Sequence, residues 1–465
     1  MESILEFGDI SFNEIERHIF GEVVQEGARV FRRVLEALDA QLSERRSGGR
    51  YELLGKRDRR LDSVLGTVEF TRRYYRDRET GEHVYLLDAF LGLQRGSRVS
   101  PALGHMAVVQ GVLGPSYRSA SKSLEEMYGY PVLSPETVRQ LVVDTGEAIL
   151  ADSSSRQLDP RGTKTPSVLY LEADGYWHSL QRSSRDRCEV KMLLSHEGWS
   201  PRYAGSTEYR LVGRYHWQSL QSSEAFWESA SRELYSRYDL KDTVVVINGD
   251  RASWIRQGVE YFPRALYQMD RYHIIRDLRR FLRASPQHRG EALSAYASGE
   301  IARLQYILAE ALEVLPAGDS RDKLEDLLFD IAEHPESCLD YRQRLPKLGI
   351  DTAGMRGLGA AESTVDRFSN RTRKRGQSWS VRGLMGILRA IEKYFEGNIA
   401  DYTLRVDRIR NMNLTEEIAA GAGRLKRRTL KRVWDAKQAT PITMNMGTNR
   451  TGGLSKLMRA ISHPT

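Results

Sequence analysis

The sequence predicts an α/β fold built on a mixed sheet. Three segments between residues 166 and 220 have strand character, and helices then alternate with two further strands up to residue 282. Val244 to Ile247 is an unbroken β-branched run, which is typical of a strand buried on both faces. A three-stranded meander followed by alternating helix and strand is the element order of a ribonuclease H-like fold.

Each element of this region follows from its local pattern. Alternating or continuous apolar runs predict the strands, and apolar side chains at helical spacing predict the helices. The expected strands are 166–172, 189–195, 214–220, 244–247 and 266–269, and the expected helices are 226–238, 254–261 and 274–282.

The N-terminal region combines a long helix with a small β-module. Residues 10–46 carry apolar side chains at helical spacing, and Ser47-Gly48-Gly49 ends the helix. Strands are expected at residues 51–54, 64–75 and 83–90. Three arginines in or just after the middle strand add positive charge, so the module is either purely structural or contacts a phosphate backbone; they are Arg72, Arg73 and Arg76.

A helix-turn-helix is expected after this module. Helical segments 117–128 and 134–150 flank Gly129-Tyr130-Pro131, and Ser134 suits the N-cap of the second helix. Such a pair either reads DNA or simply packs as a helical hairpin. The side chains near the start of the second helix that would meet base edges are Thr137, Arg139 and Gln140.

These patterns divide the chain into seven parts. An all-helical insertion separates the last predicted helix of the sheet region from a final helical pair. The expected parts are the N-terminal helix and β-module (1–98), the helix-turn-helix region (99–150), a polar linker (151–165), the first part of the core (166–285), the helical insertion (286–359), the last helices of the core (360–400) and a basic tail (401–465).

Composition narrows the class of protein. The 465 residues carry a net charge of +8 and a pI of about 9.3, which makes nucleic acid a plausible partner. No apolar run approaches the roughly 20 residues of a membrane span, and the N-terminal residues are acidic where a signal peptide is basic. With two cysteines, Cys188 and Cys338, the chain has no disulfide framework, and we expect a cytoplasmic, nucleoid-associated protein.

Three acids stand out by position. Asp174 follows the first strand of the sheet, Asp250 follows the Val244 strand, and Glu362 lies on the helix after the insertion. In a ribonuclease H-like sheet these two strands are neighbours, so their ends bring the two aspartates close together. The alternative is that all three are solvated strand-end acids and helix caps, because a chain with 62 Asp and Glu offers many chance triples.

Close carboxylates repel one another, and a divalent cation reverses that effect. Carboxylate oxygens suit Mg²⁺ or Mn²⁺, and three of them can hold two ions about 4 Å apart. Such a pair activates a water or a 3′-hydroxyl for attack on phosphorus without a His or Cys nucleophile.

Four runs resemble a known family. YLEADGYWHSLQ, INGDRASWI, LYQMDRYHIIRDL and AAESTVDRFSNRTRKRGQSWSVRGL are similar to the ISLre2 transposases, also catalogued as an uncharacterised protein family and related to Mutator-type transposases. The resemblance covers nearly the whole chain. It implies a DDE transposase with a ribonuclease H-like core, whose catalytic and metal-binding acids would be Asp174, Asp250 and Glu362.

Two positions depart from that family. Arg251 follows Asp250 where the family often has glycine, so it either contacts a phosphate or marks a decayed or domesticated copy. The run Asp270 to His273 is similar to an Asp-x-x-His signature beside the active site, with Tyr272 where Phe is frequent. His273 is either structural or a catalytic group that orients a phosphate or donates to the leaving oxygen.

Cations and aromatic residues near the three acids have two interpretations each. A charge run is usually a solvated face, but beside a metal site it would bind substrate phosphates. The expected phosphate-binding residues are Arg371, Arg373, Lys374 and Arg375. Trp254 and Trp379 favour packing over base stacking.

The leading function is cleavage and strand transfer of double-stranded DNA at the ends of a mobile element, with terminal repeats and target DNA as partners. One alternative is a nuclease or resolvase of the same fold that hydrolyses without joining. Another is a non-catalytic DNA-binding descendant of a transposase, and a third is an RNA-binding structural protein. By analogy, a dimer or larger assembly on DNA is expected.

Overall fold

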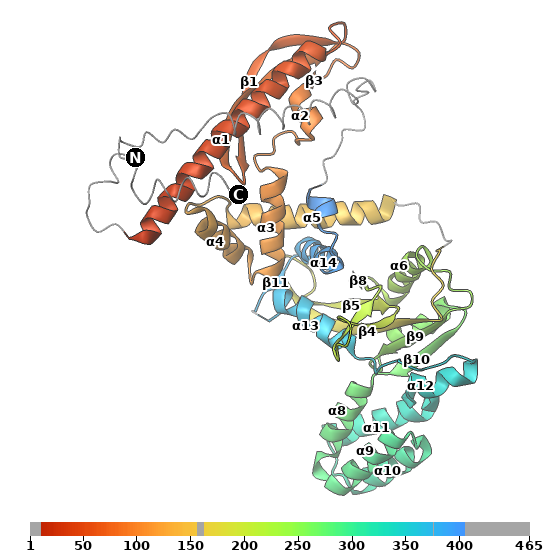
Figure 1. Cartoon of the computed structure of the whole chain (residues 1–465). Coiled ribbons are helices and arrows are strands. Elements are labelled where there is room, and N and C mark those ends of the chain that lie inside the picture. Colours follow the sequence, from red (N-terminus) through yellow and green to blue (C-terminus); the bar gives the residue numbers. More distant parts are fainter. Residues whose placement is uncertain (1–10, 156–161, 375, 405–465) are drawn as a thin grey trace. The chain divides into compact units, whose positions relative to one another are not determined.

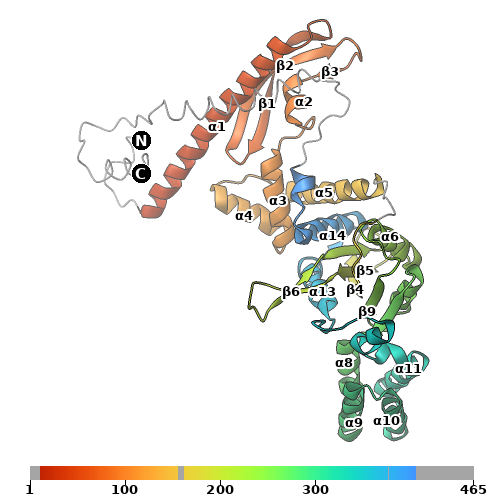
Figure 2. The same ribbon diagram turned by 45° about the vertical axis from the view of Figure 1, so that its right-hand side comes forward.

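The computed structural model describes residues 11–155, 162–374 and 376–404 (Figures 1 and 2). The chain forms two compact units, one of residues 1–103 with 406–465 and one of residues 104–405. From residue 405 onward the predicted basic tail lies outside the described residues. Every helix of the described part is too short or too polar to traverse a lipid bilayer.

In the first unit, a long helix covers an antiparallel hairpin. Helix α1 (Phe12–Arg45) agrees with the helix expected at 10–46 and begins with a capping box between Ser11 and Glu14. Strands β1 (Tyr51–Ser63) and β2 (Gly66–Asp77) pair antiparallel, and the short β3 (His83–Val84) joins β2. The core between helix and hairpin consists of apolar side chains, including Leu35, Leu38, Leu42, Leu61, Val68 and Phe70.

The strand expected at 83–90 is wrong beyond Val84. Helix α2 (Leu86–Leu91) follows instead and ends at Gly92, whose φ is 65°. Three consecutive residues of this helix are buried, so the apolar alternation there came from a single helical turn rather than from a strand. Gly92 supplies the left-handed conformation that commonly ends a helix.

Buried ion pairs hold α2 to the hairpin. The Asp88 carboxylate lies 2.6 Å from a guanidinium nitrogen of Arg59 and 3.0 Å from one of Arg72. Arg73 pairs with Asp39 of α1 at 2.7 Å, whereas Arg76 is exposed. Two of the three arginines considered for phosphate contact are therefore internal ion-pair partners.

The second unit contains the main sheet, whose central strand is β4 (Val168–Leu180). Along the sheet the order is β10-β9-β4-β5-β8. β4, β5 and β8 form an antiparallel meander, while β9 and β10 run parallel to β4. The other bounds are β5 (Arg187–His196), β8 (Tyr215–Ser219), β9 (Val244–Gly249) and β10 (Ala265–Met269). A small hairpin of β6 (Gly198–Pro201) and β7 (Tyr209–Val212) was not predicted.

One edge of β4 is shared by two strands. β9 pairs with β4 from Val168 to Ala173, and β11 (Ser378–Trp379) pairs with Ser179 and Leu180. Asp174 is therefore the first residue of β4 beyond its pairing with β9. The sheet is open at this point, between the two partner strands.

Helices cover both faces of the sheet (Figure 1). On one face, apolar side chains of β4 and β9 pack against α6 (Ser223–Tyr235), α7 (Ser253–Arg256) and α8 (Arg271–Phe281). The 3₁₀ helix η2 (Gln257–Tyr261) continues α7, and Trp254 is buried there, which confirms the packing interpretation. The other face packs against α13 (Ala360–Thr372) and α14 (Val381–Glu396), and the short α15 (Ala400–Thr403) follows.

A helical block separates α8 from α13, as the sequence predicted for residues 286–359. Its buried side chains join the core beneath the first face of the sheet. The helices are η3 (Leu282–Ala284), α9 (Pro286–Ser298), α10 (Ile301–Val314), α11 (Asp319–Glu333), η4 (Pro335–Cys338), α12 (Tyr341–Arg344) and η5 (Leu345–Leu348).

The helices before the sheet belong to the same compact unit, where we expected a linker to separate them. α3 (Pro101–Leu113) and α4 (Tyr117–Tyr128) precede α5 (Pro135–Ser155), which runs five residues into the predicted linker. α5 packs closely along α14: a Cβ on Gly146 would lie 2.4 Å from the Cα of Gly386. The polar composition of 151–165 therefore concealed a helix end, and residues 156–161 lie outside the described part.

Candidate functional site

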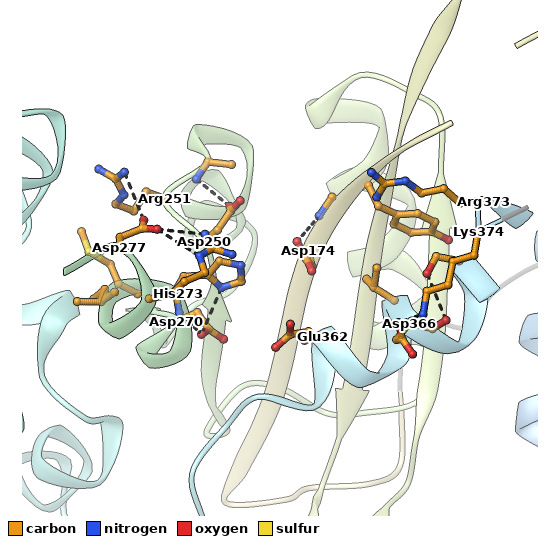
Figure 3. Close-up of a pocket in the computed structure, with 18 residues that line it drawn as sticks. Asp174, Asp250, Arg251, Asp270, His273, Asp277, Glu362, Asp366, Arg373 and Lys374 are labelled. Atoms are coloured by element: carbon orange, nitrogen blue, oxygen red, sulfur yellow. Dashed lines mark hydrogen bonds and ion pairs between the residues drawn. The ribbon is translucent and has the colours of Figure 1, made fainter. Parts of the chain in front are cut away.

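A cleft of about 800 Å³ opens where β4 loses β9 as its neighbour (Figure 3). Asp174 of β4, Asp250 after β9 and Glu362 of α13 all line it. The middle of β4, the end of β9 and the start of α13 thus contribute acids that are distant in the sequence. The strand that was expected to end at Asp174 continues to Leu180, so Asp174 marks the end of the pairing with β9 and not the end of its own strand. Figure 3 shows Asp174 and Glu362 on one side of the cleft, with Asp250 opposite them.

Asp174 is the most electrostatically perturbed of the three. Burial and the negative charge of Asp250 raise its pKa to about 6, against a smaller lowering by the backbone N–H of Gly175, which donates to Oδ1 at 2.8 Å. Because the charge of Asp250 contributes to this raised pKa, the two carboxylates repel each other electrostatically. This repulsion is the condition that a bound cation would relieve.

Local hydrogen bonds fix the turn that carries Asp250. Its Oδ1 accepts from the backbone N–H of Ala252 at 2.9 Å, and its carbonyl accepts from the Tyr267 hydroxyl at 2.6 Å. Gly249 is required just before it, because a Cβ there would lie 2.7 Å from the carbonyl oxygen of Ala173. The close approach of β9 to β4 at this residue sets where Asp250 stands.

Glu362 is exposed in the first turn of α13, and a buried residue holds that turn in place. The Glu172 carboxylate accepts backbone bonds from Gly359 at 2.7 Å and Ala361 at 3.2 Å. Its other oxygen faces Nε2 of His196 at 3.2 Å. Sequence reasoning missed Glu172, although its position two residues before Asp174 puts both side chains on one face of the strand.

The three acids suit a divalent cation in type and charge. Carboxylate oxygens are the ligands of Mg²⁺ and Mn²⁺, and all three side chains reach the same cleft. Across residues 11–155, 162–374 and 376–404, however, no three acidic, His or Cys side chains are close enough to hold an ion together. A cation would have to draw these carboxylates inward by side-chain rotation.

His273 lies in the same cleft, next to Asp270. Their Nδ1 and Oδ1 atoms are 3.3 Å apart, and this contact raises the pKa of His273 against the opposing effect of burial. Asp270 also caps α8 and accepts from Asn248 at 2.9 Å; despite burial, these bonds lower its pKa. Asp270 therefore makes protonation of His273 easier than that of a free imidazole.

Arg251 lines the cleft, but its guanidinium pairs with acids of the helical block, and its contact with a phosphate stays a prediction. Its guanidinium pairs with Asp330 of α11 at 2.8 Å and approaches Asp277 of α8 at 3.8 Å. Arg256 binds the same Asp330 at 3.1 Å. The residue that departs from the family pattern therefore ties the end of β9 to the helical block.

Arg371 is also a structural residue rather than the expected phosphate contact. It is 5% exposed, donates from Nε to the carbonyl of Gly111 at 2.8 Å, and lies against the rings of Tyr117 and Trp379. At helical spacing, position 371 falls on the inner face of α13. Trp379 is buried and donates to the carbonyl of Thr372 at 2.7 Å, which confirms its packing role.

Arg373 and Lys374 are exposed and line the cleft, as a phosphate-binding role requires. Lys374 pairs with Asp366, another lining acid that sequence reasoning missed. Asp277, on the opposite wall, was missed as well. The predicted Arg375 lies outside the described residues.

The three residues proposed to read base edges make contacts within the first turns of α5. Thr137 bonds to the N-cap Ser134, and Arg139 binds Glu136 at 2.6 Å. The Gln140 amide donates to Asp144 at 2.5 Å. All three are partly exposed, so DNA reading by this helix stays a prediction.

Comparison with known proteins identifies the family. The profile of the uncharacterised protein family UPF0236 matches residues 7–406. A UPF0236 protein of Caldanaerobacter subterraneus subsp. tengcongensis is 24% identical over 373 residues, covering 79% of this chain and 74% of its own. The UPF0236 protein in the vanSb 3′ region of Streptococcus gallolyticus is 26% identical over 358 residues, covering 75% of each chain.

Among solved structures, the Drosophila P element transposase strand transfer complex aligns over 71% of this chain and 87% of its own, with 10% identity. Its TM-score of 0.24 is too low to support an argument about the fold. The family profile, in contrast, spans most of the sequence. The chain belongs to the uncharacterised protein family UPF0236.

Proposed function

We propose that this protein is a DDE-type transposase with a ribonuclease H-like core, which cleaves DNA at the ends of a mobile element and joins them to target DNA. The observation that carries the proposal is the cleft that Asp174, Asp250 and Glu362 all line. The sheet supports it, because an antiparallel meander flanked by two parallel strands is the arrangement that such a core requires.

Six of the residues that line the cleft have roles in this scheme. Asp174, Asp250 and Glu362 are the ligands for two Mg²⁺ or Mn²⁺ ions. When bound, such ions activate the attacking water or 3′-hydroxyl and stabilise the leaving oxygen. Arg373 and Lys374 hold substrate phosphates at one wall, and His273, whose pKa is raised by Asp270, donates a hydrogen bond to a phosphate oxygen at the other.

The direct test uses the full-length protein, Mg²⁺ and a DNA duplex that carries both sequences flanking the gene. We expect strand cleavage and a joined product with a second plasmid. Asp174→Asn, Asp250→Asn and Glu362→Gln should each lower both by a thousandfold or more, as losses of essential catalytic groups do. Glu313→Gln, which removes an exposed acid of α10, is the matched control.

The products separate this proposal from its alternatives. Cleavage that needs the three acids but never gives a joined product identifies a nuclease or resolvase instead. DNA binding that survives in all three variants, with no cleavage by the wild type, identifies a non-catalytic binding protein.

A further inference from the structure

Helix α8 presents a stripe of arginines beside the cleft. Ile274, Leu278 and Phe281 are buried in the core, so the opposite side of the helix faces outward. Three exposed arginines occupy that side of α8 and a fourth follows in η3, and together they define what we call the α8 stripe: Arg276, Arg279, Arg280 and Arg283. The stripe was not singled out from the sequence, because RDLRRFLR also matches an ordinary amphipathic helix.

A shallow hollow of about 330 Å³ lies along the stripe. It is lined by Tyr272, Ile275, Arg276, Arg279 and Arg280. Arg276 lines both this hollow and the cleft, so the two surfaces are continuous. Tyr272 is 51% exposed and extends the surface by one more turn.

The charge of the stripe is mostly unneutralised. Arg276 contacts Asp277 at 3.2 Å, but no described carboxylate lies within ion-pair distance of Arg279, Arg280 or Arg283. Elsewhere in the helical block, Arg303 pairs with Glu300 and Lys323 with Asp319, whereas the exposed Lys347 has no ion pair among the described residues. The stripe differs from the isolated Lys347 in that three arginines without a close carboxylate lie together on one surface.

We propose that the α8 stripe binds the phosphate backbone of double-stranded DNA that continues from the cleft. This inference rests on the proposed function, and it names where the flanking duplex lies. Arginine suits the role because its planar guanidinium binds phosphate oxygens in a bidentate manner. Tyr272 to Arg280 spans about 12 Å of helix, enough to contact more than one phosphate.

Binding of an arbitrary 40-base-pair DNA duplex tests the inference apart from catalysis. The protein carries Asp174→Asn in all samples, so no cleavage occurs, and fluorescence anisotropy gives the dissociation constant between about 50 and 200 mM salt. Replacing Arg279, Arg280 and Arg283 by Ala should weaken binding roughly tenfold to a hundredfold. The slope of log K against log salt should fall by about three, since each neutralised phosphate contributes about 0.9.

Two controls keep the result specific. The triple Lys variant at the same three positions keeps the charge and should keep most of the salt slope. A second triple Ala variant, at Arg232, Lys241 and Lys347, removes the same charge from exposed positions outside the cleft and the hollow, and should bind nearly as the parent does.

Equal effects of the two Ala variants would overturn the inference and leave the proposed function standing. Binding of duplex RNA with no binding of duplex DNA would also overturn it. Conversely, loss of cleavage in the three acid variants together with an unchanged salt slope in the stripe variant would support the proposed function alone. Circular dichroism of each variant excludes unfolding as the cause.

Discussion

The Glu172 carboxylate accepts a 2.7 Å hydrogen bond from the backbone of Gly359, although 187 residues separate them. Glu172 is 1% exposed on β4, the strand of Asp174, and Gly359 immediately precedes α13, the helix of Glu362. One buried acid thereby sets the distance between two of the three candidate metal ligands. Its negative charge also suits the positive end of the helix.

Glu172→Gln should impair the cleft more than the fold. The neutral amide loses charge-assisted bonds to the start of α13, each worth about 1.5–3 kcal/mol, so the turn that carries Glu362 loosens. We expect strand cleavage to fall at least about tenfold and the Mg²⁺ concentration for half-maximal rate to rise. Glu233→Gln removes a buried acid from α6 and is the control. A normal Mg²⁺ dependence in Glu172→Gln would contradict a positioning role.

Arg251→Gly restores the residue that the family often has and should destabilise the protein. The change removes a part-buried ion pair with Asp330, and we expect a loss of about 1 kcal/mol in the free energy of unfolding. Asp330→Asn should cost a similar amount, and the double variant should cost less than the sum. Urea unfolding measures all three. Strict additivity would mean that Arg251 stabilises the chain in some other way.

Arg371→Ala and Arg373→Ala should separate stability from DNA binding. Arg371 is buried against Tyr117 and Trp379, so its loss should cost about 2–4 kcal/mol of unfolding free energy. Arg373 is exposed in the cleft, so its loss should leave stability within about 0.5 kcal/mol and weaken duplex binding several-fold. Thermal unfolding and anisotropy titrations give the two values. The reverse pattern would restore Arg371 as a phosphate contact.

The sequence predicted the features that depend on local pattern. The β-branched run at Val244, the helical spacing in the insertion and the cap at Ser134 each indicated an element that the structure contains. Asp250 was found because the end of a buried strand is recognisable in sequence, and Asp174 because its strand was expected to end there. Glu362 was found from its place on the helix after the insertion. Their separations, in contrast, depend on side-chain rotamers that no pattern encodes.

The contacts that the sequence did not show share one cause, which is that a side chain's partner lies far away in the sequence. Arg251 looked available for phosphate because its partner Asp330 is 79 residues further on. Arg371 looked like part of an exposed basic run until the fold placed Gly111 against it. The role of Glu172 could not be predicted, because the backbone groups that its carboxylate binds, at the start of α13, are distant in the sequence.

Asp174 should make the metal-free protein less stable as pH rises. Its pKa is about 6 in the folded protein, against about 4 in an unfolded chain, so between these values the folded form binds more protons. Stability therefore falls from pH 4 to pH 6 and is then constant. With EDTA present, Asp174→Asn should exceed the wild type in unfolding free energy by up to about 2–3 kcal/mol at pH 7.5, and the difference should vanish near pH 4.

Millimolar Mg²⁺ should stabilise the wild type at pH 7.5 and leave the Asp174→Asn variant unchanged, because only the wild type retains the Asp174 carboxylate as a metal ligand. Asp326→Asn, at an exposed acid of α11, should follow the wild type in every condition. If Mg²⁺ does not change the unfolding free energy of the wild type at pH 7.5, the cleft does not bind the ion that the proposed chemistry needs.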